Sequence, residues 1–219
     1  ASKGETFRRI IEEKTAILDI GGGSIQISLF DKDTLVSTQN LRLGVLRLQE
    51  LLNHLNAGST QMEQLVDELA TAQLDDYKKL YLKDREIKNI IIVDDYLSPW
   101  AVRKAHERGD GNAMVDSKAF YQLMEALRTR GTTELAKRMD IAEEKVPLVY
   151  ISAVLTKRIA ELMGAALIWA PGVTLCDGIA YEYAEQNKLL RGEHDFAEDI
   201  IACAMNISKR YNGSTRRAD

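Results

Sequence analysis

The chain has 219 residues, of which 45% are hydrophobic and 28% charged, a composition typical of a globular domain. Its formal net charge of −4 gives it no general attraction to nucleic acid or anionic lipid, so we expect neither as a partner. No apolar run approaches the roughly 20 residues that cross a bilayer, and residues 1–13 lack the apolar core of a signal peptide. Both observations favour a cytoplasmic protein without membrane contact.

The first part of the chain alternates strands with turns. Residues 2–13 show helical spacing of apolar side chains, and residues 15–20 form an apolar run that predicts a buried strand. Three glycines at 21–23 end that strand, and alternating apolar and polar residues predict further strands over 24–30 and 34–43. The pattern is a meander of hairpins in which a glycine turn joins the first two strands.

The middle of the chain alternates helices with two strands. Apolar spacing, capping residues and prolines predict helices over 45–55, 59–81, 116–129, 132–138, 147–164 and 175–189. Apolar runs predict strands over 88–94 and 165–169. A three-stranded meander followed by strand–helix crossovers is the topology of a ribonuclease-H-like half-domain. We therefore predict a mixed five-stranded sheet flanked by helices.

The pattern changes after Arg191 and Gly192. Residues 194–211 predict a separate amphipathic helix, and residues 212–219 are polar. We expect one domain over residues 1–191 and the first helix of a truncated C-terminal helical domain over 192–219.

The two cysteines, Cys176 and Cys203, stand alone on apolar stretches. A disulfide framework or a cysteine metal site needs more cysteines at closer spacing. We expect both to be small buried hydrophobic side chains in a reducing compartment.

The glycine turn carries the residues best suited to chemistry. Glycine reaches positive φ angles and has no Cβ, so successive N–H groups at 21–23 can converge on a phosphate without much positive charge. Asp19, at the end of the first strand, is placed to hold a divalent metal ion, and Ser24 offers a hydroxyl beside the turn. Residues 19–24 have the parts of a metal–phosphate cradle. The alternative is a tight hairpin that binds no ligand.

The sequence Asp-Ile-Gly-Gly-Gly-Ser at 19–24 resembles a turn of the exopolyphosphatase and guanosine-pentaphosphate phosphohydrolase (Ppx/GppA) family. The resemblance continues in Leu-Arg-Leu-Gly-Val-Leu-Arg-Leu at 41–48 and returns in Leu-Cys-Asp-Gly-Ile at 175–179. His-Asp-Phe at 194–196 and the helix after it are similar to the start of the family's C-terminal helical domain. The resemblance spans nearly the whole chain, and the glycine turn is its most specific part.

The resemblance implies a fold of the actin, sugar kinase and heat-shock chaperone superfamily, a reaction and a set of site residues. Family members remove the terminal phosphate of polyphosphate or guanosine pentaphosphate with Mg²⁺, in a cleft between two actin-like halves. The first half supplies a catalytic glutamate, so this chain would be an inactive second half that needs a missing N-terminal half in cis. Family members are often homodimers. The implied phosphate-binding residues are Gly21, Gly22, Gly23 and Ser24, the implied metal ligand is Asp19, and no catalytic residue is expected in this chain.

Three positions depart from the family's pattern. Gln26 stands where the family has a glutamate, and it can neither supply charge to Mg²⁺ nor act as a base. Residues 93–99 replace a second glycine-rich turn, with Asp94 and Asp95 and no glycine, and Lys145 replaces the family's usual entry to the long helix. Three hypotheses stay open: a phosphohydrolase with altered metal geometry, a non-catalytic phosphate-binding or regulatory module, and a nucleotide-binding kinase-like half-domain.

Other polar residues favour ordinary structural roles. Because adjacent residues at a strand end point to opposite sides, we expect at most one useful carboxylate from Asp94 and Asp95. Asp177, before Gly178, is a candidate to approach the cleft from the opposite side. Arg103, Lys104 and Arg108, together with His106, form either a solvated helix face, which we favour, or a patch that attracts a long polyanion. The other residues that we assign to solvated or packing positions are His54, His194, Tyr181 and Tyr183.

Overall fold

A computed structural model describes residues 9–10, 12–32, 34–55, 59–109, 113–189 and 196–210. In chain order the elements are β1 (Thr15–Ile20), β2 (Ile25–Asp31), β3 (Thr34–Leu41), α2 (Val45–His54), α3 (Ser59–Tyr77), a π-helical turn (Lys78–Leu82), β4 (Asn89–Asp94), α4 (Ser98–Glu107), β5 (Met114–Val115), α5 (Ser117–Thr129), α6 (Thr132–Met139), a 3₁₀ turn (Glu143–Lys145), α7 (Val146–Met163), β6 (Leu167–Trp169), α8 (Leu175–Gln186) and α9 (Phe196–Arg210). Most of the predicted tail over 2–13 and the predicted polar end over 212–219 lie outside the described residues.

The strands of the described residues form one mixed sheet in the order β3-β2-β1-β4-β6-β5. β1 and β2, and β2 and β3, are antiparallel, whereas β4 runs parallel to both β1 and β6. The predicted α/β fold class is therefore confirmed. The sheet has a sixth strand because β5, only two residues long, pairs antiparallel with β6 and is too short to leave a pattern in the sequence.

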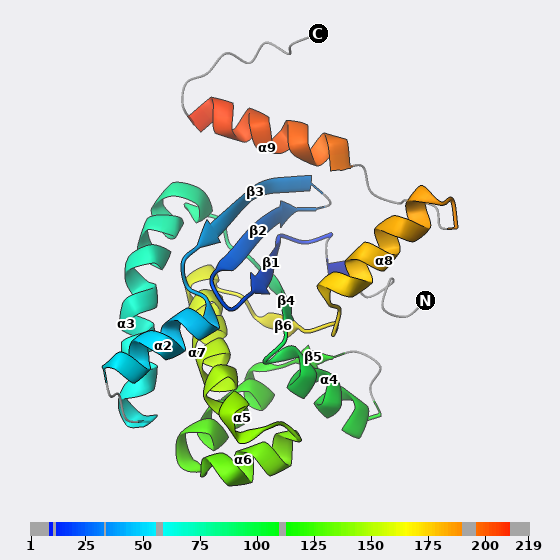
Figure 1. The fold of residues 1–219 in the computed structure, drawn as a ribbon. Coiled ribbons are helices and arrows are strands. Elements are labelled where there is room, and N and C mark those ends of the chain that lie inside the picture. Colours follow the sequence, from blue (N-terminus) through cyan, green and yellow to red (C-terminus); the bar gives the residue numbers. More distant parts are fainter. Residues whose placement is uncertain are drawn as a thin grey trace.

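One face of the sheet holds the main hydrophobic core. Leu18, Ile27 and Ile92 are fully buried on this face, in one cluster with residues of α2, α3 and α7. Figure 1 shows α2, α3 and α7 lying together beside the sheet, α5 and α6 past the end of α7, and α4 next to β5. The other face carries a smaller apolar cluster around Ile91 and Trp169. The carboxyl ends of β1 and β4 meet at one edge, where Ile20 pairs with Asp94.

α4 is a helix that the sequence pattern did not predict. It begins beside Pro99, and only the small side chains of Ser98, Ala101 and Ala105 are buried, so it lacks a strong apolar stripe. Apart from the tail over 2–13, the other predicted helices and strands are present, with ends shifted by a few residues. In the described part of the chain, no helix combines the length and apolar character that crossing a membrane requires.

The last two helices pack less than the rest. α8 has no buried residue, and α9 lies beside β3 (Figure 1). The expectation of a buried thiol is wrong for Cys176, which is exposed and free, because α8 contributes nothing to the core. The side chain of Cys203 lies outside the described residues.

Candidate phosphate site

The glycine turn closes the β1–β2 hairpin at the edge where the parallel strands end. The N–H of Gly21 donates to the carbonyl of Ser24 at 2.9 Å. None of the three glycines has a positive φ angle, so the turn does not use the left-handed conformation that favours glycine. A Cβ at Gly22 would lie 2.8 Å from the end of the Leu46 side chain on α2, which is exposed and can move aside.

The first turn of α2 holds the carbonyl groups of all three glycines. The N–H of Val45 donates to Gly21 at 3.0 Å, and the N–H of Arg47 donates to Gly22 at 3.1 Å. The Nε of the Arg47 side chain donates to the carbonyl of Gly23 at 3.3 Å. These contacts also cap the helix, since its N-cap residue has no side chain for that purpose.

This arrangement fixes where the N–H groups of the turn point. In a planar trans peptide, the C=O of one residue and the N–H of the next point in opposite directions, and the described chain has no cis peptide bond. Carbonyls 21 to 23 face α2, so the N–H groups of Gly22, Gly23 and Ser24 face away from it. Those three N–H groups make no hydrogen bond within the described part of the chain. They form a row of free donors suited to an anion.

Two glycines of the site have opposite surroundings. At Gly44, the residue before α2, a Cβ would lie 2.1 Å from the carbonyl carbon of Gly23 and 2.2 Å from the oxygen of Gly22. Only glycine fits at position 44, because any side chain would prevent α2 from packing this closely against the turn. Gly23 is exposed and has a negative φ, and a Cβ there would meet nothing within 4 Å. The fold itself does not require glycine at position 23.

Asp19 lies beside the turn on the sheet face opposite the main core. It is paired across the sheet with Gln26 on one side and Val93 on the other, and its side chain is exposed. Partial burial raises the pKa of Asp19, and the nearby charges of Asp95 and Asp94 raise it further. These causes of the raised pKa are burial and neighbouring negative charge, so a bound cation would be favoured at this edge.

Asp94 and Asp95 have different roles, as expected for adjacent residues. Asp94 is 9% exposed, and its carboxylate accepts hydrogen bonds from the N–H groups of Leu97 and Ser98 and from the hydroxyl of Ser152. It therefore fixes the start of α4 against α7. Asp95 is exposed and remains available beside Asp19.

Gln26 lies next to Asp19 in the sheet, with Asn40 beyond it on β3. All three side chains are exposed, so they form a polar row on the open face of the sheet. The position of Gln26 is thus adjacent to the candidate metal ligand, where a neutral amide brings no charge. Gly44 and Arg47 are site residues that the sequence did not identify as such. Their signal in the sequence was their place in the segment 41–48 that resembles the family, which gave neither residue a role.

The other candidates do not join the site. Asp177 forms a capping box with Thr174 at the start of α8: the N–H of Thr174 donates to the Asp177 carboxylate at 2.8 Å, and the N–H of Asp177 donates to the Thr174 hydroxyl at 3.3 Å. His194 lies outside the described residues. The remaining candidates are side chains on exposed or half-buried helical positions: His54, Arg103, Lys104, His106, Arg108, Tyr181 and Tyr183. Lys104 pairs with Glu107, and Arg108 donates to the carbonyl of Met114, which agrees with a solvated helix face.

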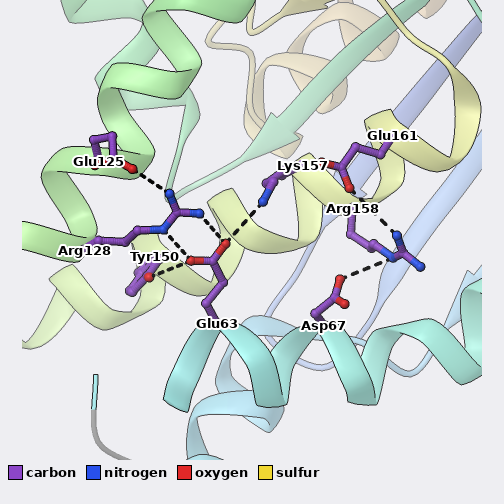
Figure 2. Close-up of polar contacts among 8 residues, drawn as sticks. All are labelled: Glu63, Asp67, Glu125, Arg128, Tyr150, Lys157, Arg158 and Glu161. Atoms are coloured by element: carbon purple, nitrogen blue, oxygen red, sulfur yellow. Dashed lines mark hydrogen bonds and ion pairs between the residues drawn. The ribbon is translucent and has the colours of Figure 1, made fainter. Parts of the chain in front are cut away.

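A second polar cluster links α3, α5 and α7 away from the turn (Figure 2). Arg128 donates to both carboxylate oxygens of Glu63 at 2.6 Å, and Tyr150 and Lys157 also donate to Glu63. Arg158 lies 3.3 Å from Asp67, close enough for an ion pair. A cavity of about 380 Å³ opens beside this cluster, but its charged side chains are already paired with one another. The cluster is therefore a structural link between helices, with no charge left for a ligand.

Comparison with known proteins supports the fold. No protein-family model and no curated protein sequence matches the chain. A Ppx/GppA family member from Aquifex aeolicus is similar in structure, with a TM-score of 0.64 and 12% identity over 80% of this chain and 57% of its own. An exopolyphosphatase from Cytophaga hutchinsonii matches with a TM-score of 0.54 and 15% identity over 75% of this chain and 58% of its own.

An exopolyphosphatase-like protein matches with a TM-score of 0.55 and 15% identity, over 68% of this chain and 49% of its own. The chain thus spans about half the length of the solved structures that it matches. At these identities the likeness establishes the fold. The structural resemblance to Ppx/GppA proteins predicted from the glycine turn is confirmed, and this chain has the fold of about half of such a protein.

Proposed function

We propose that the chain is the phosphate-binding half of a phosphohydrolase that removes terminal phosphate from a phosphoanhydride chain, either polyphosphate or guanosine pentaphosphate. The row of free N–H groups at Gly22, Gly23 and Ser24 is the observation that carries this proposal. Such a row binds phosphate oxygens by backbone dipoles, which suits a protein of net negative charge. Gly21 shares in the turn through its carbonyl, because its own N–H is bonded to Ser24.

A magnesium ion fits the edge beside this turn. The described residues contain no cluster of three or more histidine, cysteine or acidic side chains able to hold a metal ion. Mg²⁺ needs fewer protein ligands, because it keeps several waters and binds substrate phosphates together with one or two carboxylates. Asp19 and Asp95 would supply those carboxylates, and Ser24 would add a hydroxyl. When bound, the ion would neutralise charge on the phosphate groups.

The residues of this chain bind and orient the substrate in the proposed reaction. Phosphoryl transfer depends mostly on positioning and on electrostatic stabilisation, and the turn supplies both through fixed donors. Gln26 has no basic group, so the proton acceptor for the attacking water must come from elsewhere. We propose that it comes from an N-terminal actin-like half in cis, with residues 1–191 as the second half and residues 192–219 as the start of a helical domain. Dimerisation of the complete protein is part of the same proposal.

Phosphate release from long-chain polyphosphate with Mg²⁺ tests the proposal. We expect turnover by a protein that contains this chain together with its proposed first half, and none by the 219-residue chain alone. Asp19→Asn should lower the rate at least about tenfold, because it removes one charged ligand from the metal site. The matched control is Asp31→Asn, an exposed carboxylate at the far end of β2. Equal activity of the two variants would exclude Asp19 from the site.

A binding or regulatory module is the second candidate function. Gln26 favours it, because the neutral amide is the direct neighbour of Asp19 in the sheet. In that case the completed protein would bind a polyphosphate without hydrolysing it. If the missing carboxylate at position 26 is the only reason for the lost hydrolysis, Gln26→Glu should restore phosphate release by the completed protein.

A further inference from the structure

We infer that Arg47 is a positioning residue of the phosphate turn, an inference that rests on the proposed function of that turn. Its backbone N–H holds the carbonyl of Gly22 at 3.1 Å, and its side-chain Nε holds the carbonyl of Gly23 at 3.3 Å. One residue therefore fixes two successive peptide groups. The N–H groups on the far sides of these peptides belong to Gly23 and Ser24, two of the three free donors.

The side of the turn on which Arg47 lies decides whether it contacts a bound phosphate directly or orients the N–H group that does. Its guanidinium contacts the carbonyl side of the Gly23–Ser24 peptide, whereas an anion would sit on the N–H side. Arg47 therefore acts on the ligand by orienting the Ser24 N–H. Its guanidinium lies on the opposite side of the peptide and does not contact the phosphate. Gly44 packs against the Gly23–Ser24 peptide, and the exposed side chain of Arg47 donates a hydrogen bond to its carbonyl.

Three substitutions separate the hydrogen bond from the charge. Alanine removes both. Glutamine carries its amide nitrogen at the same number of bonds from the backbone as the arginine Nε, so it keeps the donor and loses the charge. Lysine keeps the charge and has a methylene at that position. The backbone N–H of residue 47 remains in all three variants, and Arg42→Ala serves as control for the loss of an exposed positive charge nearby.

The test measures the affinity of the chain for tripolyphosphate with Mg²⁺ by calorimetry. We expect Arg47→Ala and Arg47→Lys to bind about fivefold more weakly, and Arg47→Gln and Arg42→Ala to stay within about twofold of the unsubstituted chain. Full affinity of Arg47→Lys with weak binding by Arg47→Gln would overturn the inference in favour of direct charge contact. Unchanged affinity of Arg47→Ala would also overturn it.

A second measurement keeps the inference testable if the chain does not bind tripolyphosphate. The ¹⁵N heteronuclear NOE of the Ser24 amide reports how firmly its peptide is held in the free protein. We expect it to fall in Arg47→Ala and Arg47→Lys and to be retained in Arg47→Gln, with unchanged melting temperature in all. No binding with this NOE pattern would refute the proposed function and leave the positioning role in place. An NOE unaffected by Arg47→Ala would refute the positioning role itself.

Discussion

Gly44→Ala is expected to lower the free energy of unfolding by about 3 kcal/mol or more, at the upper end of what overpacking costs. The added Cβ would lie between 2.1 and 2.3 Å from three backbone atoms of residues 22–24, which cannot move aside as a side chain can. Relief requires α2 to separate from the turn, and this breaks the hydrogen bonds from Val45 and Arg47 to the glycine carbonyls. Urea denaturation followed by circular dichroism measures the loss.

Gly23→Ala is the matched control for this substitution. It makes the same chemical change in the same turn, at a position with a negative φ and open space. We expect its free energy of unfolding to stay within about 1 kcal/mol of the unsubstituted chain. Similar stability of the two variants would mean that α2 does not approach the turn as closely as the structure has it.

Glu63→Gln is expected to lower the free energy of unfolding by about 2 to 3 kcal/mol at pH 7. Hydrogen bonds from Arg128 lower the pKa of the Glu63 carboxyl from 4.5 to about 2, and its side chain is only 22% exposed. Substitution leaves the guanidinium of Arg128 with Glu125 as its remaining acidic partner, and Tyr150 and Lys157 lose an anionic acceptor. Unpaired charges of this kind are costly when they are partly buried.

The effect of Glu63→Gln on stability should become smaller as the pH falls. Because the folded-state pKa of Glu63 lies below its unfolded value, its contribution to stability is complete above pH 4.5 and is lost as the pH falls toward 2. The difference in unfolding free energy between Glu63→Gln and the unsubstituted chain should therefore shrink by more than half between pH 7 and pH 3. Glu134→Gln is the control: its partners Arg130 and Arg138 lie on or beside one exposed helix, and surface pairs contribute less than about 1 kcal/mol. A difference for Glu63→Gln that is constant with pH would contradict the assigned ion pair.

The sheet could be predicted because its signals are local. Alternation over residues 24–30 and the apolar runs of β1 and β4 reflect which face of each strand is buried, and the structure has these residues in strands. The glycine turn was located for the same reason. α4 and β5 were missed, because one buries mainly small side chains and the other has only two residues.

The site could be predicted only in part, because its geometry depends on contacts distant in sequence. The clustering of glycines at 21–23 pointed to a phosphate turn, but the position where close approach requires glycine is Gly44, before α2. The orientation of the N–H groups follows from Arg47, which is 24 residues from its side-chain acceptor Gly23. Likewise, only the hydrogen bonds from α4 and α7 show that Asp94 is structural and that Asp95 is the residue left beside Asp19.

Titration of the ¹⁵N-labelled chain with tripolyphosphate and Mg²⁺, followed by amide chemical shifts, tests the central claim most directly. We expect the amides of Gly22, Gly23 and Ser24 to shift together and to saturate with one affinity. The Gly21 amide should shift less, because it is already bonded to Ser24. Shifts confined to another region, such as Lys157 and Arg158 beside the α3–α7 cavity, or no saturable shift at the turn, would contradict a phosphate site at the glycine turn.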